Sequence, residues 1–272
     1  MLIDLIVFKE AGGNPTGLIT TNHPFETHQD IGRKIIDISK QWDKSPPVEQ
    51  VAFLLKREYK FLKFRMAGGE SCGNALLAMG AYANNMEDGE SKVEMILGSN
   101  HANFQSEKVA AYTDQGVTWM DFNLDKLAIE NISNATIIHL DGISHAVVPA
   151  SYNNSVIEED EIKKILESFG ILSKPAAGIM YVKDKDNQID LNPFVHVKAL
   201  NTCINETACG SGSIAAGIWK VLKENNDIDN FHIIQKTGKP IYVSIKRSGN
   251  DFLAKFGTEV SLIFKGSVEI DL

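Results

Sequence analysis

The stretch GGESCGNALLAMG, residues 68–80, places a cysteine between glycines and polar residues at the start of a run of alanine, leucine and methionine. The run predicts a helix from about Asn74 to Asn84, with Cys72 at its amino end. A buried structural cysteine is normally surrounded by apolar side chains, whereas a helix amino end carries free N–H groups and partial positive charge that favour a thiolate. Cys72 is therefore a candidate reactive thiol.

A second stretch, ETACGSGSIAAG over residues 206–217, repeats this arrangement. Cys209 is again followed by a glycine and a small polar residue at the start of an alanine-rich helix, and it lies 209 − 72 = 137 positions after Cys72, about half the chain. Two similar halves that pack face to face can bring equivalent helix starts to one ligand cleft. Either cysteine alone fits a structural role, but the repeat favours catalysis by both. Cys203 lacks this context and is assigned to packing.

Strand-like and helix-like segments alternate on both sides of the two motifs, which predicts an α/β (α+β) fold with two domains. We expect an N-terminal domain over residues 1–134 and a C-terminal domain over residues 135–261, with a last strand over residues 262–272 that can return to the first domain. The turn-forming sequence AGGNPTG at 11–17 is expected to separate the first two strands. The other expected elements are helices at 28–41 and 158–171 and strands at 2–9, 18–20, 51–55, 59–66, 92–98, 102–113, 117–124, 135–142, 144–150, 176–184, 192–200, 231–238, 241–247, 252–258 and 260–270.

The composition narrows the class of partner. The 272 residues are 43% hydrophobic and 23% charged, as in an ordinary globular protein, and the net charge is −8. An acidic chain without a basic stripe argues against nucleic acid or an anionic membrane as a partner, so we expect a small molecule instead. The opening MLIDLIVF lacks the basic region and cleavage site of a secretory signal, and no segment is long and apolar enough to span a membrane. A homodimer is compatible with the sequence.

The cysteines also indicate the compartment and argue against a metal site. Three cysteines do not form a disulfide framework, and an odd number fits a reducing cytoplasm in which thiols stay free. Cys203 and Cys209 are too far apart for a CxxC zinc knuckle, and no pair of histidines follows them. We therefore expect a cytoplasmic protein without a bound metal.

Two like groups on opposite faces of one carbon suit racemisation. One thiolate removes the Cα proton of an amino acid, and the opposite thiol returns a proton to the other face. The intermediate carries charge on the substrate carboxylate, which the N–H groups of two helix amino ends would stabilise. The same helix ends are expected to lower the pKa of both thiols towards neutrality. Gly73 and Gly210, beside the two cysteines, would let the backbone approach the substrate closely.

At this point the motifs resemble those of diaminopimelate epimerases. ETACGSGSIAAG is similar to their second active-site motif and ESCGNA to their first; the turn from Phe8 to Asn14, the SHAVVP segment at His145 and the TGKPIYV segment near the end also have counterparts there. The resemblance implies a pseudo-symmetric pair of domains, each a mixed, mostly antiparallel sheet wrapped around a central helix. It also implies cofactor-independent racemisation, with Cys72 and Cys209 as the two bases.

Departures from that family change the expected substrate. Met66 stands where diaminopimelate epimerases carry an asparagine, and Asn201 and Thr202 stand where they carry a Glu-Arg pair. The form MxGxExCGNA and the segment VEQVAF are instead similar to the histidine racemases that feed opine-type metallophore synthesis. That match implies histidine as the substrate, with diaminopimelate as the alternative, and it makes Glu49 a substrate contact.

Further polar residues are candidate substrate contacts. Asn74, and Ser211 at the same place in the second motif, can cap a helix or contact the substrate carboxylate. Asn14 fits either a plain turn or a ligand contact. Glu206 suits a helix start but can equally hold the substrate ammonium group. His145 is either an ordinary strand residue or a substrate contact.

Three other interpretations stay open on the sequence alone. Isomerases related to phenazine synthesis share the implied architecture but carry a carboxylate in place of a cysteine. A cysteine hydrolase would use Cys72 as nucleophile and His145 or His196 as base, and it would leave Cys209 without a role. His196 otherwise fits the surface of a sheet. A non-catalytic amino-acid binder would keep its affinity when both cysteines are replaced by alanine.

Overall fold

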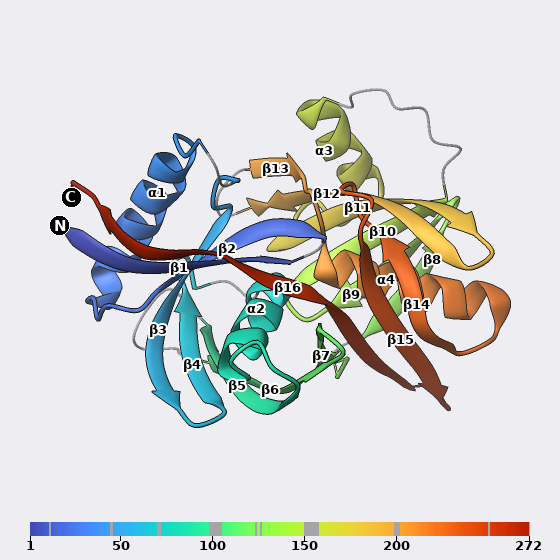
Figure 1. Ribbon diagram of the computed structural model, residues 1–272. Coiled ribbons are helices and arrows are strands. Elements are labelled where there is room, and N and C mark those ends of the chain that lie inside the picture. Colours follow the sequence, from blue (N-terminus) through green and yellow to red (C-terminus); the bar gives the residue numbers. More distant parts are fainter. Residues whose placement is uncertain are drawn as a thin grey trace. The chain divides into compact units, whose positions relative to one another are not determined.

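The computed structural model divides the chain into two units (Figure 1). The first unit comprises Met1–Asp121 and Gly257–Leu272, and the second comprises Phe122–Phe256. Both units combine strands with few helices, so the fold is a sheet-dominated mixed α+β fold. The structure describes residues 1–10, 12–43, 46–69, 72–97, 105–122, 124–125, 127–149, 158–198, 202–249 and 251–271.

The first unit is built on a sheet that follows the order β1-β2-β3-β4-β5-β6-β7-β16, and β16 also pairs with β1. The pairs β1–β2, β3–β4 and β5–β6 are antiparallel, whereas β2–β3 and β4–β5 are parallel. Its strands are β1 (Leu2–Glu10), β2 (Gly13–Ile19), β3 (Gln50–Glu58), β4 (Phe61–Met66), β5 (Gly89–Leu97), β6 (Gln105–Asp114), β7 (Val117–Phe122) and the later part of β16 (Asp251–Glu269).

The second unit repeats this alternation of antiparallel and parallel neighbours. The pairs β9–β10, β11–β12 and β14–β15 are antiparallel, whereas β10–β11 and β12–β14 are parallel. Its strands are β8 (Ala128–Ile132), β9 (Ala135–Leu140), β10 (Ile143–Pro149), β11 (Ala176–Lys185), β12 (Gln188–Val197), β13 (Thr202–Asn205), β14 (Ile228–Ile234) and β15 (Pro240–Ser248). The same order of pairings therefore occurs in both halves of the chain.

The unit boundaries differ from the ones expected at residues 134 and 261. β8 forms an antiparallel hairpin with β9, so the residues just before 134 belong to the second unit. β16 passes from the second unit into the first, where Val260–Glu269 pairs antiparallel with β1. Figure 1 shows this end of the chain in red beside the dark blue β1. The sequence signal that was missed is β8, which has only five residues and little apolar alternation.

Two helices are enclosed by the strands of their own unit. α2 (Gly73–Ala83) contacts β1 to β6, and α4 (Gly210–Glu224) contacts β9 to β12, β14 and β15. Both helices are buried on most of their surface, as expected for helices without a polar face. A Cβ on Gly80 would lie 2.6 Å from a side chain of β6, and a Cβ on Gly217 would lie 3.1 Å from side chains of β15. These glycines, each eight positions after its cysteine (80 − 72 and 217 − 209), allow the close approach of helix to sheet.

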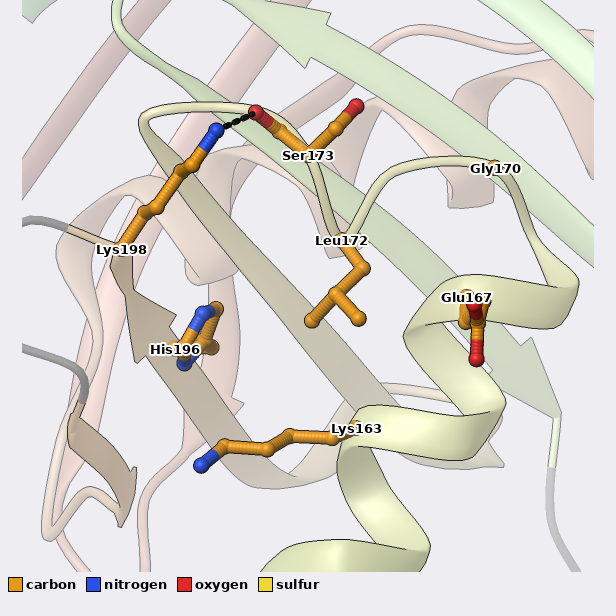
Figure 2. Close-up of a pocket in the computed structure, with 7 residues that line it drawn as sticks. All are labelled: Lys163, Glu167, Gly170, Leu172, Ser173, His196 and Lys198. Atoms are coloured by element: carbon orange, nitrogen blue, oxygen red, sulfur yellow. Dashed lines mark hydrogen bonds between the residues drawn. The ribbon is translucent and has the colours of Figure 1, made fainter.

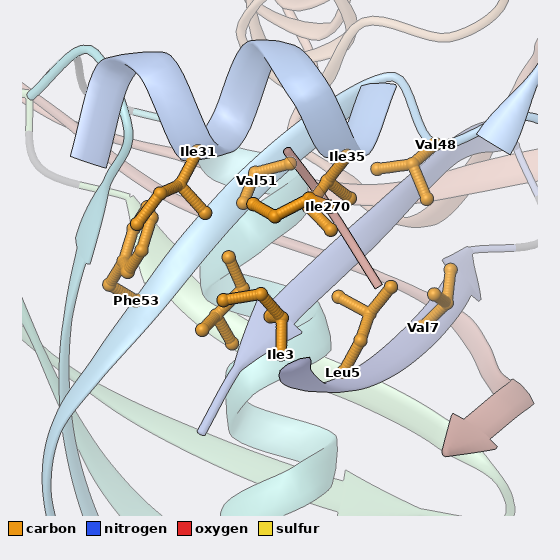
Figure 3. Close-up of a cluster of buried hydrophobic side chains, with 10 residues drawn as sticks. Ile3, Leu5, Val7, Ile31, Ile35, Val48, Val51, Phe53 and Ile270 are labelled. Atoms are coloured by element: carbon orange, nitrogen blue, oxygen red, sulfur yellow. The ribbon is translucent and has the colours of Figure 1, made fainter. Parts of the chain in front are cut away.

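The other two helices are amphipathic and cover a sheet face. In α1 (His28–Ser39), which follows a short 3₁₀ turn at Phe25–Thr27, Ile31 and Ile35 point into the core cluster shown in Figure 3. α3 (Glu159–Ser168) does the same in the second unit through Ile162 and Leu166. The cluster in the first unit consists of Ile3, Leu5, Val7, Ile19, Ile31, Ile35, Val48, Val51, Phe53 and Ile270.

The expected turn over residues 11–17 is much shorter in the structure. β1 and β2 form a tight hairpin in which Glu10 lies opposite Gly13, so β2 already begins at Gly13 rather than at residue 18. Gly13 and Asn14 have φ values of 123° and 60°. Glycine and asparagine tolerate positive φ better than other residues, which explains why turn-forming residues stand inside a strand here. Parts of five expected strands lie outside the described residues: Gly98, residues 102–104, Asn123, Ala150 and residues 199–200.

None of the helices formed by the described residues combines the length and hydropathy that a membrane crossing requires.

Candidate active site

Cys72 is the N-cap residue of α2. Its backbone has φ −144° and ψ 106°, and its Sγ accepts a hydrogen bond from the N–H of Ala75 at 3.4 Å. The thiol is half-buried and donates to Oε1 of Gln50 at 2.9 Å. Gly73 and Asn74 form the first turn of the helix behind it, and the side chain of Asn74 is 7% exposed. The structure thus gathers three predicted residues at one helix start.

Cys209 occupies the same position on α4. Its backbone has φ −137° and ψ 109°, and its Sγ accepts a hydrogen bond from the N–H of Gly212 at 3.3 Å. The backbone N–H of Cys209 donates to Oε1 of Gln235 at 3.1 Å. Cys209 is 5% exposed, so this thiol is more deeply buried than Cys72. Both units therefore present a thiol that caps a helix amino end with nearly the same backbone geometry.

The structure corrects the expectation that the helix end lowers the pKa of both thiols. Burial raises the pKa of the Cys209 thiol well above its usual value, and the nearby carboxylate of Glu206, hydrogen-bonded to the thiol, raises it further. The N–H of Gly212 and the hydroxyl of Ser211 act in the opposite direction. Desolvation and a neighbouring negative charge thus outweigh the helix end at this thiol.

His145 and Ser211 continue the polar arrangement around Cys209. The hydroxyl Oγ of Ser211 lies 3.7 Å from Sγ of Cys209 and 2.9 Å from Nε2 of His145. His145 is completely buried on β10, opposite Gly178 of β11. His145 is thus linked to Cys209 through Ser211, and its role as a substrate contact stays a prediction.

Burial of His145 predicts a pH-dependent stability. Burial lowers the pKa of this imidazole to about 3, whereas the unfolded chain titrates near the ordinary 6.5. Between these values only the unfolded chain binds the proton, so the free energy of unfolding should fall as the pH falls, by up to about 1.4 kcal/mol per pH unit. Urea unfolding of wild type and His145→Gln at about pH 7 and about pH 5 measures this slope. In His145→Gln the slope should be smaller than in wild type by the equivalent of one bound proton.

The remaining predicted contacts of the first unit lie near the start of β3. The N–H of Glu49 donates to the carbonyl of Pro15 at 2.9 Å, and its exposed carboxylate acts electrostatically on Glu10. Asn14 is 7% exposed, and its carbonyl accepts a hydrogen bond from Thr16 at 3.4 Å. Asn14 and Glu49 are therefore linked through the backbone of Pro15, which follows Asn14. Gln50, the residue after Glu49, contacts Cys72.

His196 belongs to a different part of the second unit. It is 5% exposed on β12, opposite Cys203 of β13, and it lines a depression of about 440 Å³ beside α3 (Figure 2). Lys163 and Lys198 also line this depression, and Lys198 donates to the carbonyl of Ser173 at 3.3 Å. Among the described residues, no cysteine lines it. The prediction that His196 lies exposed on the sheet surface is wrong, because this side chain is buried. Cys203 packs against the apolar cluster of this unit, as expected.

Two glutamines contact the cysteines and were not singled out from the sequence. Gln50 begins β3 and Gln235 follows β14. The side chain of Gln235 is 3% exposed and also donates to Ser213 at 3.0 Å. The signal that could have found them is a polar amide next to a run of buried strand residues, since such an amide needs partners.

One known protein family matches nearly the whole chain. The model of the histidine racemase CntK N-terminal domain matches residues 9–269. The chain belongs to this family. A histidine racemase from Fusobacterium nucleatum is 27% identical over 202 residues, which cover 72% of this chain and 73% of that protein. A histidine racemase from another strain of that species is 26% identical over 208 residues.

Solved structures share the fold at low sequence identity. A PhzC/PhzF phenazine biosynthesis protein from Clostridium difficile matches with a TM-score of 0.65 and 14% identity, covering 98% of this chain and all of that one. A phenazine biosynthesis protein of the PhzF family from Bacillus anthracis matches with a TM-score of 0.68 and 12% identity, covering 99% of this chain and all of that one. These members of a different family thus have the same sheet-dominated α+β fold as this racemase-family chain.

Proposed function

We propose that this protein is a cofactor-independent histidine racemase that inverts Cα with two thiols. The observation that carries the proposal is the repeated helix start, in which Cys72 and Cys209 cap α2 and α4 with matching backbone angles and matching Sγ contacts. Membership of the racemase family makes the chain an amino-acid racemase, which is an isomerase, and favours histidine over diaminopimelate as the substrate.

We also propose that the two units are pseudo-symmetric and that each sheet wraps around its cysteine helix. The repeated order of strand pairs, the contacts of α2 and α4 with six strands each, and the glycine eight residues after each cysteine support this arrangement. The mechanism requires that the two sulfur atoms reach one Cα from opposite faces. A cytoplasmic location is proposed on the ground that three cysteines, an odd number, do not make a disulfide framework.

In this mechanism the proton moves between sulfur and carbon in both half-steps. The thiolate of one cysteine takes the Cα proton, the C–H electron pair passes onto the substrate carboxylate, and the thiol of the other cysteine gives its proton to the opposite face. The first cysteine ends as thiol and the second as thiolate. This form acts on the other enantiomer, and proton exchange of the two thiols with solvent restores the first form. N–H groups at the two helix starts, with Gly73, Asn74, Gly210 and Ser211, hold the carboxylate and its added charge.

Glu206 connects substrate binding to the ionisation of Cys209. Its carboxylate raises the pKa of this thiol, and we propose that it holds the ammonium group of the substrate. A cation beside Glu206 offsets the negative charge that Cys209 experiences, so the bound substrate itself favours the thiolate. We propose Asn14 and Glu49, at the start of β3, as further contacts for the substrate.

The test is incubation of the purified protein with L-histidine in D₂O. We expect deuterium at Cα, detected by loss of the Cα proton signal in NMR, together with D-histidine on chiral chromatography, until both enantiomers are present in equal amounts. If histidine showed no exchange of its Cα proton and no inversion, the result would contradict the proposal. Turnover of diaminopimelate alone would replace the substrate and keep the two-thiol mechanism.

A further inference from the structure

The contacts behind Cys72 assign a role to two residues on β1 and β2. We propose that Glu10 and Thr16 are positioning residues that, through Gln50, hold Cys72 as a thiol that donates its proton. They touch neither the thiol nor the reacting carbon. Their action is to fix which end of the Gln50 amide faces the sulfur.

A chain of hydrogen bonds leads from Cys72 to a buried carboxyl group. Sγ of Cys72 donates to Oε1 of Gln50 at 2.9 Å, and Nε2 of Gln50 donates to Oγ1 of Thr16 at 2.7 Å. Oγ1 of Thr16 donates to Oε1 of Glu10 at 3.3 Å. All donors in this chain point away from the sulfur, and its groups lie on neighbouring strands of one sheet, because Thr16 and Gln50 are register partners of β2 and β3.

The direction of these hydrogen bonds decides whether the thiol or the thiolate form of Cys72 is stabilised. A threonine hydroxyl has one hydrogen, which Thr16 can direct to Oε1 of Glu10 at 3.3 Å or to the carbonyl of Asn14 at 3.4 Å. In both cases the hydroxyl can only accept from Gln50. The amide of Gln50 then turns its NH₂ group towards Thr16 and its oxygen towards Cys72. An acceptor beside the sulfur stabilises the thiol, whereas an N–H donor in the same place would stabilise the thiolate.

Glu10 has the properties of a fixed end point. The residue is 1% exposed, and among the described residues its second oxygen, Oε2, has no hydrogen-bond partner. Burial raises the pKa of this carboxyl group well above its usual value, although the backbone N–H of Glu10 itself and, to a smaller extent, the hydroxyl of Thr16 act in the opposite direction. A buried carboxyl group with one unpaired oxygen costs stability, and its contact with Thr16 is the function that we assign to it.

Charged groups on neighbouring segments also influence this part of the first unit. The carboxylate of Glu49 raises the pKa of Glu10, which adds to the effect of burial. Arg65 on β4 is buried and donates to the carbonyls of Met66 and Ala67, and its charge lowers the pKa of His28. On α2, the N–H of Ala75 donates to Sγ of Cys72 and works in favour of the thiolate, so Gln50 and Ala75 oppose one another.

The test measures the pH dependence of alkylation of each cysteine by iodoacetamide, followed by mass spectrometry of the peptides. In Thr16→Val the hydroxyl is lost at constant shape, so the Gln50 amide can turn its NH₂ group to the sulfur. Alkylation of Cys72 should then become about tenfold faster at a fixed pH below its midpoint, a shift of roughly one pH unit. Thr16→Ser keeps the hydroxyl and should match wild type.

Glu10→Gln tests the end of the chain without changing its size. A glutamine can offer either oxygen or NH₂ to Thr16, so we expect a smaller shift of Cys72 in the same direction. The double variant should shift no further than Thr16→Val, since both changes break one chain. If Thr16→Val does not fold, as judged by circular dichroism, Glu10→Gln decides alone.

Three outcomes would overturn the inference: an unchanged Cys72 profile in the folded variants, shifts that add in the double variant, or an equal shift at Cys209 and Cys203. The last would indicate a general structural change. The catalytic role of Cys72 rests on the proposed function, but alkylation measures the thiol alone. An inactive racemase with the expected alkylation shifts would therefore contradict the proposed function and leave this inference standing.

Discussion

Cys72→Ser and Cys209→Ser should each lower the rate of histidine racemisation by about 10³-fold, because a serine hydroxyl is a far weaker acid than a thiol and supplies neither the base nor the acid of the cycle. Proton transfer by a positioned side chain typically contributes 10²- to 10⁴-fold. Chiral chromatography of the product measures the loss. Cys203→Ser is the matched control, since Cys203 packs against the apolar cluster of the second unit, and it should keep wild-type turnover.

The two variants should also differ in which enantiomer exchanges its Cα proton. With one thiol left, the protein can remove a proton only from the face that this thiol reaches, and it can return deuterium from D₂O only to that same face. We therefore expect slow exchange without inversion, in one enantiomer for Cys72→Ser and in the other for Cys209→Ser. Full racemisation by either variant, or exchange of the same enantiomer in both, would refute the two-base assignment.

The helix starts could be predicted from the sequence because helix caps are local. The expected helix from about Asn74 begins at Gly73 and ends at Ala83, and both cysteines are N-caps. The environment of the thiols could not be predicted in the same way. Gln50 lies 22 positions before Cys72 and reaches it through strand register. The burial of Glu10 at the end of β1 likewise depends on residues far from it in the sequence.

The pKa of Cys209 shows the same limit for electrostatics. The helix start alone favours a thiolate, and the sequence therefore indicated a lowered pKa. The opposite direction results from strands of the second unit that exclude water from the thiol and from the carboxylate of Glu206 beside it. Burial of the Cys209 thiol is a property of the whole fold, so the direction of its pKa shift could be read only from the fold. The unit boundary was misplaced for a related reason, since β8 is recognised by its pairing with β9.

Gly212→Ala should reduce racemisation by about 10²-fold while leaving the protein folded. A Cβ at this position would overlap Sδ of Met180 and would lie 3.1 Å from Sγ of Cys209. Met180 is completely buried on β11, but its flexible side chain can move at modest cost. The thiol has less freedom, because the N–H of Gly212 is its capping donor at 3.3 Å. A displacement of about 1 Å of a reacting group can cost about 10²-fold in rate.

Gly217→Ala on the same helix separates this effect from a general change in the helix. Both substitutions replace a glycine of α4 by a residue of higher helix propensity. The three atoms nearest to the added Cβ at Gly217, however, are side-chain atoms of Ile245, Val243 and Ile228, at 3.1 to 3.4 Å. Gly217→Ala should therefore change thermal stability and leave the kcat nearly unchanged, whereas Gly212→Ala should lower kcat with a smaller effect on stability. Equal losses of kcat in the two variants would mean that the loss does not come from displacement of the Cys209 thiol at the start of α4.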